Sequence, residues 1–179
     1  MSRLERGSPV RTAILLLGLG NPDRRDDGVG PLVVRGLADG LASDASAGTE
    51  HRDVARLMEA WAGFSGLVVV DAALGGGLAP GAARTIDPDR EPLPRTPRDP
   101  SGHALGLAEA LELSAVLGGR PQAIRIVAVG AADIGWGAGL SAPVEEALAT
   151  IRAAVADALA AVRREIEAEA TGPPPPRAP

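Results

Sequence analysis

Short apolar runs of strand length alternate along this chain with longer amphipathic segments of helix length, and this alternation constrains the fold more than any other feature. Residues 13–17 and 67–70 are apolar throughout, as expected of strands that are buried on both faces of a sheet. Strands that alternate with helices favour right-handed crossovers and a parallel sheet. The sequence therefore predicts an α/β fold: a single three-layer α/β/α domain whose mostly parallel, twisted sheet has helices on both faces.

The last helix has the clearest pattern. Ser141 is a candidate N-cap, Pro143 lies in the first turn, and apolar residues at steps of three or four positions continue to Ile166. No internal repeat or second domain boundary is visible, so we predict one domain over 11–170 with flexible tails at 1–10 and 171–179. The other predicted elements are strands at 13–17, 45–50, 67–70, 82–86 and 123–129, helices at 29–38, 54–62 and 103–117, and a solvated Pro- and Arg-rich loop at 88–102.

Composition excludes several kinds of chemistry. The 179 residues include no cysteine, which excludes disulfides, thiolate metal sites and cysteine nucleophiles. All 18 basic residues are arginines, so a P-loop lysine and Schiff-base catalysis are excluded as well. A net charge of −5 with one phenylalanine and two tryptophans argues against nucleic acid as a partner. No apolar run approaches the roughly 20 residues that cross a bilayer, and we expect a cytoplasmic monomer that does not act on membranes.

Acidic residues and a histidine follow the predicted strands. Ligands bind outside the carboxyl ends of the strands in a parallel sheet. Asp26 and Asp27 lie in the turn after the first strand, and Asp71 ends the strand at 67–70. His103 begins a helix that follows another strand. Two carboxylates and one imidazole could therefore converge on this edge. Such a set suits zinc, nickel or a similar ion, and three protein ligands leave one position open for substrate or water.

Each of these residues also has an ordinary structural alternative. Asp26 or Asp27 could cap the helix that follows the turn. A carboxylate at the position of Asp71 could be paired within the structure, and His103 could be a surface or capping residue. The other histidine, His51, lies in a polar stretch and is expected to face solvent.

The glycine-rich segment after the first strand has a competing interpretation as a phosphate-binding loop. Counted from Gly18 and Gly20, the dinucleotide fingerprint requires glycine at a position that is occupied by Asp23. A carboxylate there would repel a pyrophosphate group. We therefore expect no organic cofactor.

With these residues assembled, the sequence resembles the hydrogenase maturation proteases. These endopeptidases remove the C-terminal extension from the large-subunit precursor of nickel–iron hydrogenases. Individually the shared motifs are weak, but their order and spacing over about 130 residues are specific. The motifs occupy 17–22, 26–30, 48–49, 68–72, 80–81, 101–107 and 139–144.

The resemblance implies a metal site formed by Asp27, Asp71 and His103, the residues that also follow the predicted strands. It further implies that the site recognises nickel already inserted in the precursor, so that nickel arrives with the substrate. We therefore predict a precursor-processing endopeptidase with Asp27 and Asp71 as catalytic residues and these three residues as metal ligands. Relatives often carry glutamate where this chain has Asp27, whose side chain is one methylene shorter.

Alternative functions fit parts of the same pattern. A non-catalytic assembly protein could capture nickel at this site, and a protease could process another metalloprotein precursor. Peptidyl-tRNA hydrolases also begin with a strand followed by Gly-Leu-Gly-Asn-Pro, but they place a catalytic histidine in the next turn. Residues 23–30 contain no histidine, and the chain lacks the basic surface that tRNA requires. We therefore reject the tRNA hydrolase.

Overall fold

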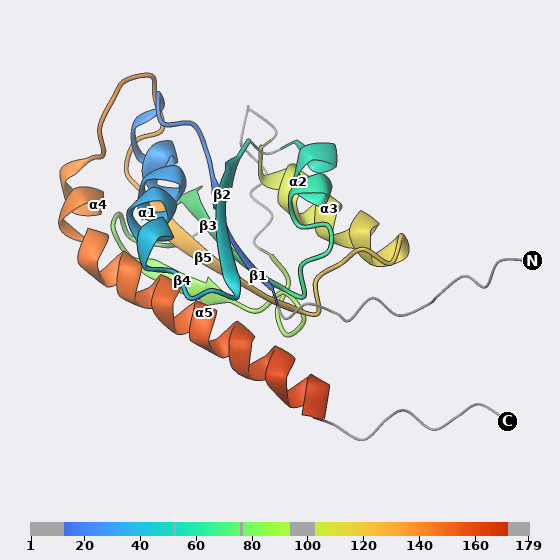
Figure 1. Ribbon diagram of the computed structural model, residues 1–179. Coiled ribbons are helices and arrows are strands. Elements are labelled where there is room, and N and C mark those ends of the chain that lie inside the picture. Colours follow the sequence, from blue (N-terminus) through green and yellow to red (C-terminus); the bar gives the residue numbers. More distant parts are fainter. Residues whose placement is uncertain (1–12, 52, 76, 94–102, 172–179) are drawn as a thin grey trace, which may run out of the picture.

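The computed structural model describes residues 13–51, 53–75, 77–93 and 103–171, with the side chains of 103–105 left aside (Figure 1). The predicted N-terminal tail, most of the predicted C-terminal tail and residues 94–102 of the predicted loop lie outside these ranges. Thr171, which we assigned to the C-terminal tail, is instead the last residue of a helix.

Within the described residues, five strands form one sheet in the order β2-β1-β3-β5-β4. Adjacent strands run parallel except for β4, which pairs with β5 in the antiparallel direction at one edge. The predicted mostly parallel α/β sheet is therefore confirmed. The strands are β1 (Ile14–Leu19), β2 (Ala45–Glu50), β3 (Gly66–Leu74), β4 (Ala83–Ile86) and β5 (Ala123–Ala131).

Helices cover both faces of the sheet, as the predicted three-layer arrangement requires (Figure 1). One face packs against α1 (Val29–Leu37) and α5 (Leu148–Thr171). The other face packs against α2 (Val54–Ala60) and α3 (His103–Val116). None of the described helices is long and apolar enough to cross a membrane.

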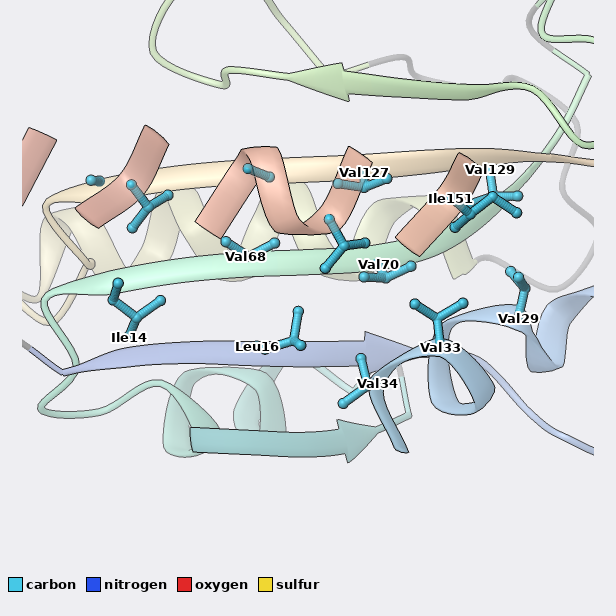
Figure 2. Packing of buried hydrophobic residues seen from close by; sticks show 14 of the residues in the cluster. Ile14, Leu16, Val29, Val33, Val34, Val68, Val70, Val127, Val129 and Ile151 are labelled. Atoms are coloured by element: carbon cyan, nitrogen blue, oxygen red, sulfur yellow. The ribbon is translucent and has the colours of Figure 1, made fainter. Parts of the chain in front are cut away.

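Alternation along the central strands supplies the two hydrophobic cores. Successive strand side chains point to opposite faces, so Val68 and Val70 join one core while Val69 joins the other. Figure 2 shows the first core, in which Val33 of α1 and Ile151 of α5 lie among the valines of the sheet. These side chains are completely or almost completely buried. Continuous β-branched runs therefore form strands because both of their faces are covered.

The predicted last helix is divided in two. A short α4 (Ala142–Glu146) is followed by one non-helical residue, Ala147, and α5 begins at Leu148. The apolar stripe continues across the break, since both Val144 and Ile151 are fully buried. An interruption that preserves the spacing of three or four residues leaves the apolar periodicity intact, and for this reason the sequence pattern did not reveal the break.

Strand β3 is longer than predicted, and this corrects the position of Asp71. We expected the strand to end there, but pairing with β5 continues from Asp71↔Ala128 to Leu74↔Ala131. The ladder with β1 ends earlier, at Gly18↔Val70. Asp71 is therefore the first residue of β3 beyond its pairing with β1, inside the strand rather than after it.

Candidate functional site

In the turn between β1 and α1, the Asp27 carboxylate lies against the backbone of Gly20 and Asn21. The turn contains a 3-10 helix, η1 (Arg25–Gly28). Gly20 has a φ of +126°, and a Cβ there would collide with the carbonyl of Asp27 and lie 3.3 Å from its Cγ. The Asn21 N–H donates to Asp27 Oδ2 at 2.7 Å, and Asp27 is only 6% exposed. Glycine at position 20 thus allows the carboxylate to lie close to the end of the first strand.

Close backbone contact places the start of α1 over the end of β1 and over the middle of β3. A Cβ at Gly30 would clash with the carbonyl oxygens of Leu19 and Val70, and one at Gly18 would clash with the backbone of Gly30. The start of α1 therefore rests directly on the two strands, and η1 contacts β3. Because Asp71 follows Val70, its backbone lies close to the segment that begins α1.

The third predicted ligand is placed only by its backbone. His103 is the first residue of α3, as predicted. Helix α3 runs against the direction of the parallel strands, so its first turn lies toward their carboxyl ends (Figure 1). The His103 side chain is outside the described part of the structure, and the described side chains include no cluster of three metal-binding residues. The predicted ligand set of Asp27, Asp71 and His103 therefore stays a prediction. His51 is exposed, as expected.

Asp26 has a structural role that the sequence did not reveal. It is completely buried, and its Oδ2 accepts hydrogen bonds from the backbone N–H groups of Ala132 at 2.8 Å and Asp133 at 3.0 Å. Ser141 contributes its N–H to Oδ1 at 2.6 Å and its hydroxyl to Oδ2 at 2.8 Å. Burial raises the pKa of Asp26, but these hydrogen bonds outweigh burial and hold the pKa below its ordinary value. Asp26 is thus an ionised anchor for the loop after β5.

The helix-capping alternative for the acidic pair is wrong. The N-cap positions of η1 and α1 are occupied by Arg24 and Gly28. Ser141 does occupy the predicted N-cap position at the start of α4, but its hydroxyl donates to Asp26 instead of capping the helix. The partners are 115 positions apart in the sequence, and no local pattern indicates such a pairing.

Backbone hydrogen bonds join the same two loops. The Arg25 N–H donates to the Gly137 carbonyl at 2.9 Å, and the Gly137 N–H donates to the Asp23 carbonyl at 2.9 Å. The Asp26 N–H donates to the Asp133 carbonyl at 3.0 Å. Arg25 adopts a φ of +44°, which is uncommon outside glycine. The turn that carries Asp27 is therefore fixed by the loop after β5 as well as by the strands beneath it.

Comparison with known proteins agrees with this architecture. A family model described as hydrogenase maturation protease matches residues 45–158, a range that includes Asp71 and His103 but not Asp27. No curated protein sequence matches the chain.

Solved structures of three proteins illustrate the similarity. The hydrogenase maturating endopeptidase HybD from Escherichia coli is 27% identical, with 85% of this chain and 93% of that chain covered and a TM-score of 0.71. The [NiFe] hydrogenase maturation protease HybD from Thermococcus kodakarensis is 28% identical, with 83% and 99% covered and a TM-score of 0.66. An endopeptidase from Escherichia coli, at 24% identity, 82% and 91% coverage and a TM-score of 0.72, supports the fold alone.

The family match extends over more than half of the chain, and it falls on the α/β fold that the sequence predicted. The resemblance found in the short motifs is therefore confirmed, as is the prediction of a peptide-bond hydrolase. This chain belongs to the hydrogenase maturation protease family, whose members are endopeptidases.

Proposed function

We propose that this protein removes the C-terminal extension from a nickel–iron hydrogenase large-subunit precursor that already carries nickel. In this proposal Asp27, Asp71 and His103 bind the nickel of the substrate. The observation that supports it is the close packing of Gly30 on the carbonyls of Leu19 and Val70, the residue directly before Asp71. Two carboxylates on one sheet edge suit a divalent cation.

The chemistry is hydrolysis of one peptide bond. Nickel belongs to the substrate, so binding it would position the scissile peptide next to the two carboxylates. A carboxylate oxygen that is not bound to nickel would accept a proton from water, and the resulting hydroxide would attack the peptide carbonyl carbon. The C–N bond then breaks, and the same proton passes to the departing amine. Asp27 and Asp71 are the candidates for this role.

The deciding experiment is the intact mass of a nickel-loaded precursor after incubation with the protein. We expect the wild type to release one C-terminal peptide, and Asp27→Asn, Asp71→Asn and His103→Ala to release none. Asp157→Asn is the matched control, since it removes one carboxylate from the exposed side of α5, far along the chain from the site. Circular dichroism should show that all four variants are folded.

Other outcomes would favour the alternatives. Cleavage by Asp27→Asn at the wild-type rate would show that the site is assigned wrongly. Absence of cleavage together with tight binding of free Ni²⁺ would favour the assembly protein, because a protease that uses substrate nickel has no need to bind the free ion tightly. Cleavage of a different metalloprotein precursor would change the substrate but keep the protease.

A further inference from the structure

A half-open groove of about 320 Å³ lies next to the turn of Asp27. It is formed by this turn, by the outer side of α1 and by the loop after β5. Its size is at the lower end of the range for small-ligand pockets, which is enough for a short stretch of polypeptide. The residues around it include Pro22, Arg25, Gly28, Leu32, Arg35 and Leu140.

The groove combines apolar side chains with two guanidinium groups. Leu32 is 38% exposed although it lies on an otherwise well-packed helix. Arg25 forms a half-exposed ion pair with Asp133 at 3.3 Å. Arg35 donates from Nε to the carbonyl of Pro31 at 3.1 Å, and no described carboxylate is within ion-pair distance of it. On a chain of net charge −5, Arg35 is a local attraction for an acidic group, whereas Arg25 already has Asp133 as its partner.

The groove is continuous with the candidate site. Gly28 lines it and directly follows Asp27 in the chain. Pro22 also lines it and follows Asn21, whose N–H binds the Asp27 carboxylate. A polypeptide advances about 3.3 Å per residue when extended. A segment bound in the groove would therefore be only a few residues away from a peptide bond held at Asp27.

The walls of the groove are held in place before any ligand binds. Arg25 on one side is hydrogen-bonded through its backbone to Gly137, and Ser141, next to Leu140, is bonded to Asp26. A preformed surface binds a partner without a large cost of ordering.

We propose that this groove binds a short segment of the hydrogenase precursor in which an apolar side chain lies near a carboxylate. The proposal rests on the proposed function, since the segment belongs to the substrate of that reaction. The apolar side chain would cover Leu32 and Leu140, and the carboxylate would pair with Arg35, whose planar guanidinium can form two parallel hydrogen bonds with it. The contact contributes to affinity for the precursor and leaves the cleavage step unchanged.

The test compares Arg35→Glu with Arg56→Glu. Both substitutions reverse one exposed arginine on a helix, but Arg56 lies on α2, which covers the opposite face of the sheet. For Arg35→Glu we expect KM for the nickel-loaded precursor to rise about tenfold with kcat unchanged, which is the effect of losing one charge-assisted contact and gaining repulsion. Arg56→Glu should keep both parameters, and Arg35→Lys should recover part of the affinity because it restores the charge without the fork.

Equilibrium binding of the same precursor separates this proposal from the proposed function. If the wild type binds the precursor but does not cleave it, the cleavage function fails, and weaker binding by Arg35→Glu than by Arg56→Glu still supports the groove. The groove proposal is overturned if Arg35→Glu and Arg56→Glu bind the precursor equally well, whether or not cleavage is observed.

Discussion

Two buried or partly buried aspartates at opposite ends of the sheet are stabilised in different ways. Asp44 directly precedes β2, and both of its carboxylate oxygens accept hydrogen bonds from Arg163 of α5 at 2.8 Å. Asp26 lies at the carboxyl end of β1 and receives its hydrogen bonds from backbone N–H groups and from the Ser141 hydroxyl. In both cases the pKa is held below its ordinary value, by the arginine for Asp44 and, against burial, by the neutral donors for Asp26.

The difference concerns the charge that remains. An arginine neutralises the carboxylate that it binds, whereas neutral donors stabilise the ionised form and leave its negative charge in place. Asp26 is adjacent to Asp27, so the neutral donors maintain a negative field where a cation is proposed to bind. At the other end of the sheet, Arg163 neutralises Asp44, and this ion pair attaches α5 to the loop before β2.

The largest expected effect is on activity, and it comes from Asp27. Asp27→Asn removes one proposed nickel ligand but keeps an oxygen that can accept the Asn21 N–H. We expect the cleavage rate of nickel-loaded precursor to fall by two to three orders of magnitude, as when one charge-stabilising group is removed from an active site, while the unfolding free energy changes by less than about 1 kcal/mol. Kinetics and urea denaturation of the same preparation check both parts. A large loss of stability would show that Asp27 is as structural as Asp26.

Asp26→Ala should show the opposite behaviour, with stability as the main effect. It leaves the N–H groups of Ala132, Asp133 and Ser141 and one hydroxyl without their acceptor. Each unsatisfied buried donor is costly, and we expect a loss of about 3–5 kcal/mol in the free energy of unfolding. Urea denaturation measures it, with Asp157→Ala as the exposed control. A cost below about 1 kcal/mol would mean that water replaces the carboxylate.

Acid should remove the contribution of Asp26 to stability. The pKa of Asp26 in the folded protein is below its ordinary value, so the ionised carboxylate stabilises the fold at neutral pH. This contribution is lost as the pH falls from the ordinary pKa of an aspartate through the lower folded pKa, because the carboxylate must then be protonated. We expect the wild type to lose stability more steeply than Asp26→Asn below about pH 4. Parallel pH dependences of the two unfolding free energies would contradict this assignment.

The smallest effect on stability is expected for the ion pair between Asp44 and Arg163. Arg163 and Asp44 are each about one third exposed, at 32% and 34%, and solvent screening reduces what their pairing contributes. A double-mutant cycle with Asp44→Asn and Arg163→Gln should give a coupling free energy of about 0.5 kcal/mol. The coupling should decrease in 1 M salt, whereas the effect of Asp26→Ala should be almost insensitive to salt because Asp26 is buried. A coupling free energy as large as the cost of Asp26→Ala would contradict the expected difference between Asp44 and Asp26.

Local patterns predicted most of the elements, but they missed the break between α4 and α5 and several contacts between distant parts of the chain. The run at 67–70 indicated a buried strand because β-branched residues are enriched in strands, and a run without polar residues suits a strand that is covered on both faces. The same reasoning missed the extension of β3 through Asp71, since that extension depends on pairing with β5 alone. It selected Asp27 and Asp71 as site residues from their position after apolar runs, and this assignment stays a prediction.

Local pattern alone could not separate Asp26 from Asp27, because each is an aspartate in the same turn, and only the family resemblance selected Asp27. What distinguishes them is a serine and two N–H groups that are more than 100 positions away. The groove beside α1 is likewise formed by residues near positions 25, 35 and 140, and no periodic pattern links these segments.

The hydrogen bonds from Ser141 to Asp26 can form only after both residues have been synthesised. The two residues are separated by 115 positions, and ribosomes add about 5–20 residues per second, so roughly 6–23 s pass between them. For most of that interval the nascent chain contains Asp26 but none of the groups that donate hydrogen bonds to its carboxylate, since Ala132 and Asp133 come shortly before Ser141. The proposed cleavage site is therefore completed only when most of the chain has been translated, and a truncated product that stops before position 141 would lack the anchored loop.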